Sequence, residues 1–143
     1  MIIPKTIKLT IDSYLENVFW IGLAVRSFCS YFYFNEVESC QIELSVVEAV
    51  TNSIKHAYQM QPMGKVDVIV SIDDRSIIFD ICDKGKTMMT FEKATLEFDP
   101  QDIESLPEGG MGLYIIQNTM DEVIYKQING MNILTLIKYL KKI

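Results

Sequence analysis

Glu48 and Asn52 stand one helical turn apart in a stretch of chain that is otherwise mostly apolar. The Glu-x-x-x-Asn spacing places a carboxylate and an amide on the same face of a helix, about 6 Å apart along its axis. Both groups need hydrogen-bond partners when they leave water. The default interpretation is a solvated helix face, and the alternative is that the pair faces a polar ligand.

A second candidate site is the stretch Asp83-Lys84-Gly85, at the end of a run of strand-forming residues. The glycine allows the backbone to turn and to approach a ligand closely. A carboxylate at this point can accept a hydrogen bond from a donor such as the exocyclic amine of a base. Asp-x-Gly after a strand is also a common turn, so this stretch alone does not separate the two interpretations.

A third candidate site is the glycine-rich stretch Gly109-Gly110-Met111-Gly112-Leu113, just before a predicted helix. Glycines at a helix N-terminus expose backbone N–H groups, and the helix dipole adds positive potential, so phosphate is the natural ligand. For a Gly-x-Gly stretch taken alone, a flexible hinge is the default interpretation. The stretch is not a dinucleotide-binding fingerprint, because the strand–turn–helix unit around it is missing.

The elements that must position these residues begin with a strand over 5–11, where apolar residues alternate. Ser13 and Glu16 have the spacing of a capping box and predict a helix from about residue 14 to the low thirties. That helix carries more aromatic residues than one buried face needs, which favours a core helix or one that also meets a partner chain. Asn35 and Glu38 predict the start of the central helix, which continues through 43–58.

The second half of the chain reads as two hairpins around a long irregular stretch. Alternation predicts a hairpin over 65–82, and strands over 123–127 and 131–139 are joined by Asn129-Gly130, the strongest short hairpin signal. Between them lies a predicted lid over about 86–108, with at most a short helical piece near 92–97, and then a helix over 112–120. Helices over one face of a mixed sheet make a two-layer α/β sandwich.

The size and charge of the chain narrow its class. Its 143 residues fit one domain, and its net charge of −6 argues against a nucleic-acid surface. The longest apolar run, 18–25, is far shorter than the ~20 residues of a membrane span. We therefore expect a cytoplasmic protein without membrane contact, whose three cysteines are reduced core thiols: Cys29, Cys40 and Cys82.

Taken together and in this order, the three candidate sites resemble the GHKL family of ATP-binding domains. Within that family, Glu48-Ala-Val-Thr-Asn52-Ser-Ile-Lys-His-Ala-Tyr58 and Gly109-Gly-Met-Gly-Leu-Tyr-Ile-Ile, followed by Met120-Asp-Glu-Val, look like the bacterial anti-sigma factor serine kinases. The resemblance covers nearly the whole chain. It implies a two-layer α/β fold of the Bergerat type, in which a mixed, mostly antiparallel sheet carries helices on one face and the chain forms a single domain over 1–143.

The resemblance implies a role for each matching residue. Glu48 would be the general base for the hydroxyl that is phosphorylated, and Asn52 would hold Mg²⁺ through its amide oxygen. Asp83 would accept a hydrogen bond from the adenine amine. Lys55 would reach a phosphate or remain a solvated lysine, and His56 would be structural. The full nucleotide-binding set implied is Asn52, Lys55, Asp83, Gly85, Gly109, Gly110, Met111, Gly112 and Leu113.

The same resemblance implies cofactors and partners. ATP and Mg²⁺ would be required, and a Ser or Thr on a STAS-domain antagonist would be the phosphorylated group. A sigma factor or similar target would be the second protein partner, and the protein would be a homodimer. No direct contact with nucleic acid is expected.

Two departures from the family pattern bear on activity. Lys86 and Thr87 stand where the fuller Asp-x-Gly-x-Gly box has its second glycine. Pro107 and Glu108 stand where close relatives carry an arginine, a cation that would stabilise charge on the transferring phosphoryl group. The leading expectation is an anti-sigma serine/threonine kinase, and the alternative is a nucleotide-binding partner-switch module with little or no kinase activity. The catalytic half of a histidine kinase is a third possibility, disfavoured because the chain has no room for a helix pair that bears a phosphoacceptor histidine.

Overall fold

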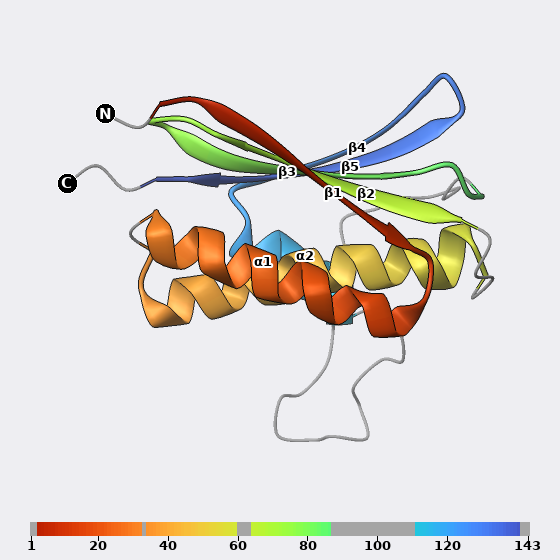
Figure 1. Cartoon of the computed structure of the whole chain (residues 1–143), viewed down its shortest axis with the longest axis horizontal. Helices are drawn as coiled ribbons and strands as arrows, with labels where there is room; N and C mark the ends of the chain where they lie inside the picture. The colour runs from red at the N-terminus through yellow and green to blue at the C-terminus, as the bar shows by residue number, and fades with distance from the viewer. Residues whose placement is uncertain (1–2, 33, 60–63, 87–110, 141–143) are drawn as a thin grey trace.

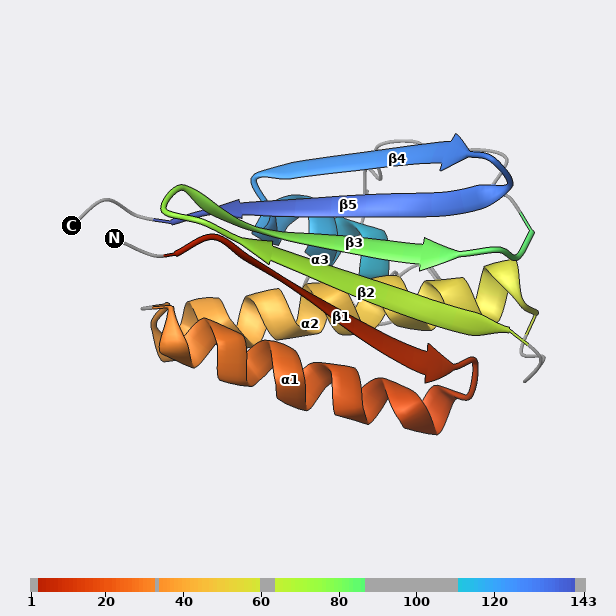
Figure 2. The same ribbon diagram turned by 45° about the horizontal axis from the view of Figure 1, so that its top comes forward.

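An antiparallel sheet of five strands, in the order β1-β2-β3-β5-β4, forms one layer of the molecule (Figures 1 and 2). The computed structural model describes residues 3–32, 34–59, 64–86 and 111–140. The strands are β1 (Lys5–Asp12), β2 (Lys65–Ile72), β3 (Ser76–Asp83), β4 (Glu122–Ile128) and β5 (Met131–Tyr139). Every strand pair among the described residues is antiparallel, so the sheet there is not mixed as expected.

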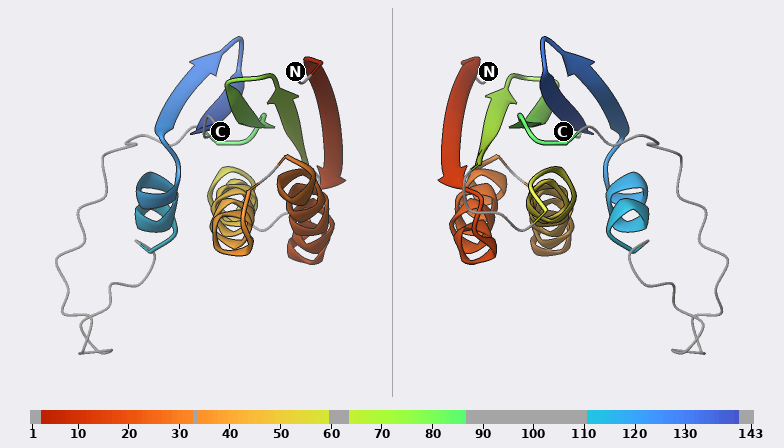
Figure 3. Two further views of the ribbon diagram at one scale, coloured as in Figure 1. Left: turned by 90° about the vertical axis from the view of Figure 1, so that its left-hand side faces the viewer. Right: turned by 90° about the vertical axis from the view of Figure 1, so that its right-hand side faces the viewer.

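In the described residues, the three α-helices form the second layer and lie side by side against one face of the sheet, with α2 between the other two (Figure 3). They are α1 (Val18–Tyr31), α2 (Glu36–Asn52) and α3 (Met111–Thr119). The expected two-layer α/β sandwich is therefore confirmed. Apart from the helical piece near 92–97, which lies outside the described residues, each predicted strand and helix corresponds to one of these elements.

Helix α2 and the turn that follows it bury one face, because apolar residues recur there every four positions. Ile42, Val46, Val50 and Ile54 are each 0% exposed. The predicted helix over 43–58 does not stay α-helical to its end, however. After Asn52 the chain widens into a π-helical turn over Ser53–Ala57, a feature that often occurs at functional sites.

The two predicted caps have different outcomes. Asn35 caps α2 as expected, because its Oδ1 accepts a hydrogen bond from the backbone N–H of Glu38 at 2.8 Å. The predicted cap at Ser13 is wrong, since Tyr14 occupies the N-cap position of the 3₁₀ turn that precedes α1. Ser13 instead joins the end of β1 to the start of β2: its N–H donates to the Gly64 carbonyl, and its hydroxyl accepts from the Gly64 N–H.

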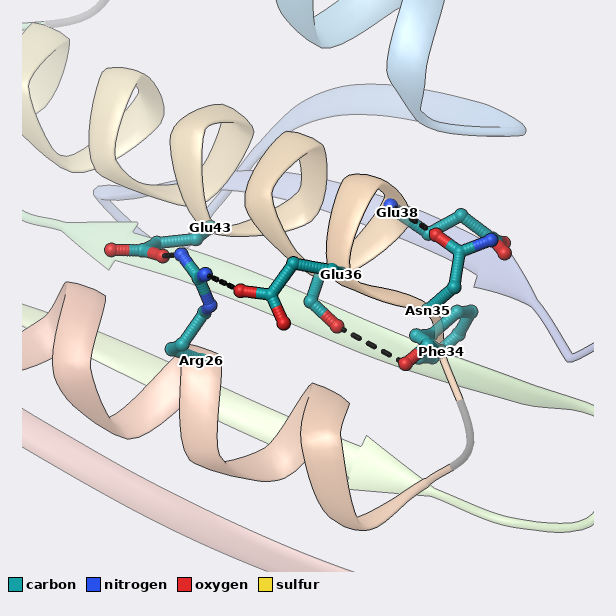
Figure 4. A network of polar contacts seen from close by, with 7 residues as sticks. Arg26, Phe34, Asn35, Glu36, Glu38 and Glu43 are labelled. Atoms are coloured by element: carbon teal, nitrogen blue, oxygen red, sulfur yellow. Dashed lines mark hydrogen bonds and ion pairs between the residues drawn. The ribbon is translucent and has the colours of Figure 1, made fainter.

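A charged contact holds α1 against α2 (Figure 4). The Arg26 guanidinium donates from Nη1 to Glu43 Oε2 at 2.8 Å and from Nη2 to Glu36 Oε1 at 2.5 Å. The planar guanidinium suits this double contact, because it presents donors in a fixed fork. The two carboxylates raise the pKa of Arg26 above its usual range.

Both predicted hairpin turns are present. In the first, Asp73 Oδ1 accepts hydrogen bonds from the backbone N–H groups of Arg75 and Ser76, which lowers the pKa of Asp73. In the second, Asn129 and Gly130 have φ values of 51° and 76°. Two successive positive φ values are the requirement of a type I′ turn, whose twist matches that of the paired strands.

Helix α1 leaves part of its aromatic surface uncovered. Phe19, Trp20 and Tyr31 are 62%, 60% and 72% exposed, whereas Phe32 is buried. The rings of Phe19 and Trp20 contact each other edge to face. None of the helices in the described residues is long and apolar enough to cross a membrane. The predicted lid lies outside the described residues apart from Lys86, and so does the helical piece near 92–97.

The cysteines are free thiols, but only two belong to the core. Cys29 and Cys82 are buried and Cys40 is exposed, so the expectation of core thiols is wrong for Cys40. Burial raises the pKa of Cys29 to about 12 and that of Cys82 to about 11. Both buried thiols therefore stay protonated at neutral and mildly alkaline pH.

This difference predicts selective thiol chemistry. The thiolate is the reactive form, so at pH 8 an aromatic disulfide reagent should modify Cys40 rapidly and leave Cys29 and Cys82 intact. In denaturant all three thiols should react, and Cys40→Ser should remove only the fast phase. The measurement is reagent absorbance against time. Rapid reaction of all three thiols in the native protein would contradict the burial of Cys29 and Cys82.

Candidate functional site

A pocket opens where the C-terminal part of α2 meets the ends of β3 and β5. Its walls come from α2 and the π-helical turn, α3, and strands β3, β4 and β5. The lining residues are Ala49, Asn52, Ser53, His56, Ala57, Ile81, Asp83, Lys86, Leu113, Tyr125, Asn132 and Leu134. The pocket is therefore apolar on most sides, with a few polar groups that converge on it, which is typical of small-molecule sites.

Asp83 is the most deeply buried carboxylate in this pocket, at 7% exposed. Its Oδ1 accepts two hydrogen bonds, from Asn132 Nδ2 at 2.8 Å and from the backbone N–H of Gly85 at 3.0 Å. These donors fix the orientation of the carboxylate. Within the described residues, no hydrogen bond reaches its second oxygen, Oδ2, which is left as an acceptor for a ligand donor.

The turn after Asp83 packs directly against the π-helical turn. A Cβ atom at Gly85 would lie 2.4 Å from the carbonyl oxygen of Ala57, and the N–H of Lys86 donates to that same oxygen at 2.7 Å. Only glycine fits this approach of two backbones. Tyr58 adds a second link, since its hydroxyl accepts from the Lys84 N–H and donates to the Lys65 carbonyl.

Glu48 and Asn52 lie beside the start of α3. A Cβ atom at Gly112 would come within 2.6 Å of Glu48 Oε2 and 3.7 Å of Asn52 Nδ2. In the part of the chain that the structure describes, neither the Glu48 carboxylate nor the Asn52 amide takes part in a hydrogen bond or ion pair. Both side chains are half-buried and have polar atoms without a partner in the described residues, as expected of groups that bind a ligand.

The structure thus brings most of the predicted site residues together. Asn52, Asp83 and Leu113 line the pocket, Gly85 forms its turn, and Glu48 and Gly112 adjoin it. Met111 begins α3, and Gly109 and Gly110 lie outside the described residues. Lys55 is exposed in the π-helical turn and is not among the lining residues, so its contact with phosphate stays a prediction. His56 and Lys86 line the pocket instead.

Asn132 is a pocket residue that the sequence did not single out. It is 3% exposed, and it faces Asp83 across the antiparallel pairing of β3 with β5. The signal was present in the alternation of β5, in which Asn132, Leu134 and Leu136 share the face toward the helices. Asn132 is the amide in that apolar series, and a polar residue at such a position indicates a candidate site residue.

Comparison with known proteins identifies the family. The model of the histidine kinase-like ATPase domain matches residues 12–138. The chain belongs to this family. It is 35% identical over 126 residues to the serine-protein kinase RsbW of Staphylococcus epidermidis. The aligned region covers 85% of this chain and 75% of that protein. It is also 35% identical over 114 residues to the serine-protein kinase RsbW of Staphylococcus aureus (strain bovine RF122 / ET3-1), or 76% of this chain and 69% of that protein.

Solved structures agree on the fold. The RsbU and RsbW domains of Rv1364c from Mycobacterium tuberculosis superpose with a TM-score of 0.66 at 15% identity, over 97% of this chain and 33% of that one. This chain thus spans about a third of the solved chain of RsbU and RsbW domains. The Acinetobacter baumannii histidine kinase AdeS superposes with a TM-score of 0.54 at 17% identity, over 96% and 70% of the two chains. The ATPase fold assigned from the family model is therefore seen in experimental structures.

The space that Glu48 occupies next to Gly112 gives a test of the site, because a Cβ atom at Gly112 would meet the Glu48 carboxylate. Gly112→Ala should displace the Glu48 carboxylate, and a shift of about 1 Å in a reacting group can cost about 10²-fold in rate. We expect phosphorylation to slow by about 10- to 100-fold without loss of folding stability, because alanine suits a helix better than glycine. The measurements are initial rates and urea denaturation.

The matched control is Gly130→Ala. Gly130 has φ +76°, and a Cβ atom added there would have no neighbour within 4 Å. Alanine should therefore cost about 1–2 kcal/mol of stability through backbone strain alone. Its rate should be unchanged. A normal rate in Gly112→Ala would show that Glu48 does not need its present position.

Proposed function

We propose that this protein is an ATP- and Mg²⁺-dependent serine/threonine kinase of the anti-sigma type. It would phosphorylate a STAS-domain antagonist and sequester a sigma factor or similar target. The observation that carries the proposal is the meeting of two kinds of group at one pocket. An oriented carboxylate, Asp83, lies at its buried end, and an uncommitted carboxylate and amide, Glu48 and Asn52, lie beside the glycine at the start of α3.

The pocket suits ATP for reasons of chemistry. Asp83 Oδ2 is an acceptor in an otherwise apolar setting, which matches the 6-amino group of adenine. Ile81 and Leu134 offer apolar surface to the base. The phosphates would extend toward the N-terminus of α3, where backbone N–H groups and the helix dipole favour negative charge. Gly109 and Gly110 would contribute further N–H groups.

Asn52 is the residue we assign to Mg²⁺. The ion prefers oxygen ligands and usually takes several of them from phosphates and water, so one protein amide oxygen is enough to orient it. When bound, Mg²⁺ neutralises charge on the phosphates during transfer. Asn52 lines the pocket, and its amide makes no hydrogen bond within the described residues, so it fits this role.

Glu48 is the residue we assign as general base. It would accept the proton of a serine or threonine hydroxyl as that oxygen attacks the γ-phosphorus of ATP. The bond between the γ-phosphorus and the β–γ bridging oxygen would break, and ADP would leave. The phosphoprotein and protonated Glu48 account for every atom and charge of the step. The substrate hydroxyl would have to enter beside Gly112, where Glu48 lies.

Support for the protein partners comes from the relatives. The Staphylococcus relatives are named serine-protein kinase RsbW, and the anti-sigma resemblance of the Glu48–Tyr58 and glycine-rich stretches extends over the same region. We therefore propose a STAS-domain antagonist as substrate, a sigma factor or similar target as second partner, a homodimer, and a cytoplasmic location.

A second candidate function has one specific observation in its favour. Pro107 and Glu108 stand before the glycine-rich loop, where the family resemblance implies an arginine. Without that cation the protein would act as a nucleotide-binding partner switch that transfers phosphate slowly or not at all. Separate assays of nucleotide binding and of phosphoryl transfer distinguish the two functions.

Nucleotide binding is tested by thermal unfolding. A ligand that binds only the folded state stabilises it by about 2.7 kcal/mol at one hundred times its Kd, which corresponds to several degrees in Tm. Mg-ATP should produce this shift, and Asp83→Ala should abolish most of it. Thr10→Ala, on β1 and outside the pocket, is the control and should respond as the parent does. If millimolar ATP leaves the parental Tm unchanged, ATP binding is refuted.

Phosphoryl transfer is tested by two substitutions with opposite signatures. General-base catalysis contributes about 10²–10⁴-fold in rate, so Glu48→Gln should abolish most transfer to a STAS protein while ATP affinity stays within about twofold. Asn52→Ala should instead weaken Mg-ATP binding. The readouts are phosphate incorporation and nucleotide titration. A parental protein that binds ATP and transfers nothing would favour the partner switch, and full activity in Glu48→Gln would remove Glu48 as the base.

A further inference from the structure

Asn132 holds a buried polar atom that has no partner. The residue lines the pocket and is 3% exposed, and its Oδ1 makes no hydrogen bond within the described residues. A buried acceptor without a donor costs about 1–3 kcal/mol, so native proteins rarely keep one without a reason. An acceptor on the wall of a ligand pocket is explained if a ligand supplies the missing donor.

The orientation of the Asn132 amide follows from its neighbours. Three oxygens surround Nδ2: Asp83 Oδ1 at 2.8 Å, the Gly85 carbonyl at 3.1 Å and the Lys86 carbonyl at 3.5 Å. None of the three can donate a hydrogen bond to the amide. Rotating the amide by 180° would therefore set oxygen against oxygen, so Nδ2 must occupy this position and Oδ1 must be the free group.

Asp83 and Asn132, which both line the pocket, thus carry two acceptors without a hydrogen-bond partner in the described residues. Asp83 offers Oδ2, Asn132 offers Oδ1, and the hydrogen bond between the two side chains holds them side by side. A primary amine on an aromatic ring carries two N–H donors in one plane. The pair of acceptors matches that group, whereas a single carboxylate would leave one N–H unpaired.

We propose that Asn132 is a specificity-determining residue, whose Oδ1 accepts the second N–H of the adenine 6-amino group while Asp83 accepts the first. The proposal rests on the proposed function, because it requires that the pocket bind ATP. It also goes beyond that function, since it predicts discrimination by two acceptors. Nucleotides with a 6-oxo group, such as GTP and ITP, would set an oxygen against both of them and be rejected.

Asn132 could affect ATP binding in two ways: by accepting from the 6-amino group itself, or by orienting the Asp83 carboxylate to which it donates. The test must separate these two effects. We therefore use the Asp83→Ala background, in which no carboxylate remains to be supported. Asn132 keeps two of its neighbours there, the carbonyls of Gly85 and Lys86. Because Asp83→Ala weakens nucleotide binding, affinities are measured calorimetrically up to millimolar nucleotide. The two nucleotides are Mg-ATP and purine riboside triphosphate, which has hydrogen in place of the 6-amino group and adds no bulk.

In Asp83→Ala, we expect ATP to bind about 3- to 10-fold more tightly than the analogue, the worth of one neutral hydrogen bond. In the double variant Asp83→Ala, Asn132→Ala, the two nucleotides should bind within about twofold of each other. Asp83→Ala, Asn17→Ala is the matched control, since Asn17 donates to the Asp12 carbonyl away from the pocket, and it should keep the preference.

Each contrary outcome has a distinct meaning. If parental protein binds ATP but Asp83→Ala binds both nucleotides equally, Asn132 does not read the amine, and a water molecule satisfies its Oδ1. If the double variant keeps the preference for ATP, another group supplies the second acceptor, and the assignment to Asn132 is overturned. Failure of the parental protein to bind ATP would instead refute the proposed function on which this inference rests.

Discussion

The burial of α2 beneath the sheet is the constraint on which the rest of the molecule depends. Its apolar residues repeat every four positions, and each fully buried aliphatic side chain contributes about 1.5–3 kcal/mol. That packing fixes the rotation of the helix about its own axis. This rotation in turn decides where Glu48 and Asn52 lie, because both residues are on the face of α2 that lies next to Gly112 at the start of α3. The core and the candidate site are therefore set by the same helix.

The opposite side of the pocket is fixed by strand register. Asp83 and Asn132 are partners in the pairing of β3 with β5, so their hydrogen bond exists only in this register. A slip by one residue would turn Asn132 to the other face of the sheet. The tight turn at Asn129-Gly130 joins β4 to β5, so its two positive φ values fix the register of that hairpin and not the pairing of β3 with β5.

Elements with a strong period could be predicted from the sequence, and single contacts between distant segments could not. The strands and helices follow from alternation, capping residues and turn pairs such as Asn129-Gly130, each of which acts over a few positions. The resemblance to a known family brought Glu48, Asn52 and Asp83 to one site. Asn132 was missed because its role depends on the alignment of two strands about fifty positions apart. Ser13 had the right spacing for a cap, yet a tertiary contact with Gly64 determined its role.

The exposed aromatic surface of α1 has a spectroscopic consequence. Trp20 is the only tryptophan in the chain, and it is 60% exposed on a helix that contributes nothing to the pocket lining. Its indole is therefore surrounded largely by water, which shifts the emission maximum to long wavelength and lets small quenchers reach the ring. A nucleotide in the pocket would not change the water around Trp20, whereas a molecule that covers α1 would displace that water. Intrinsic fluorescence in this protein thus monitors the outer face of α1 selectively.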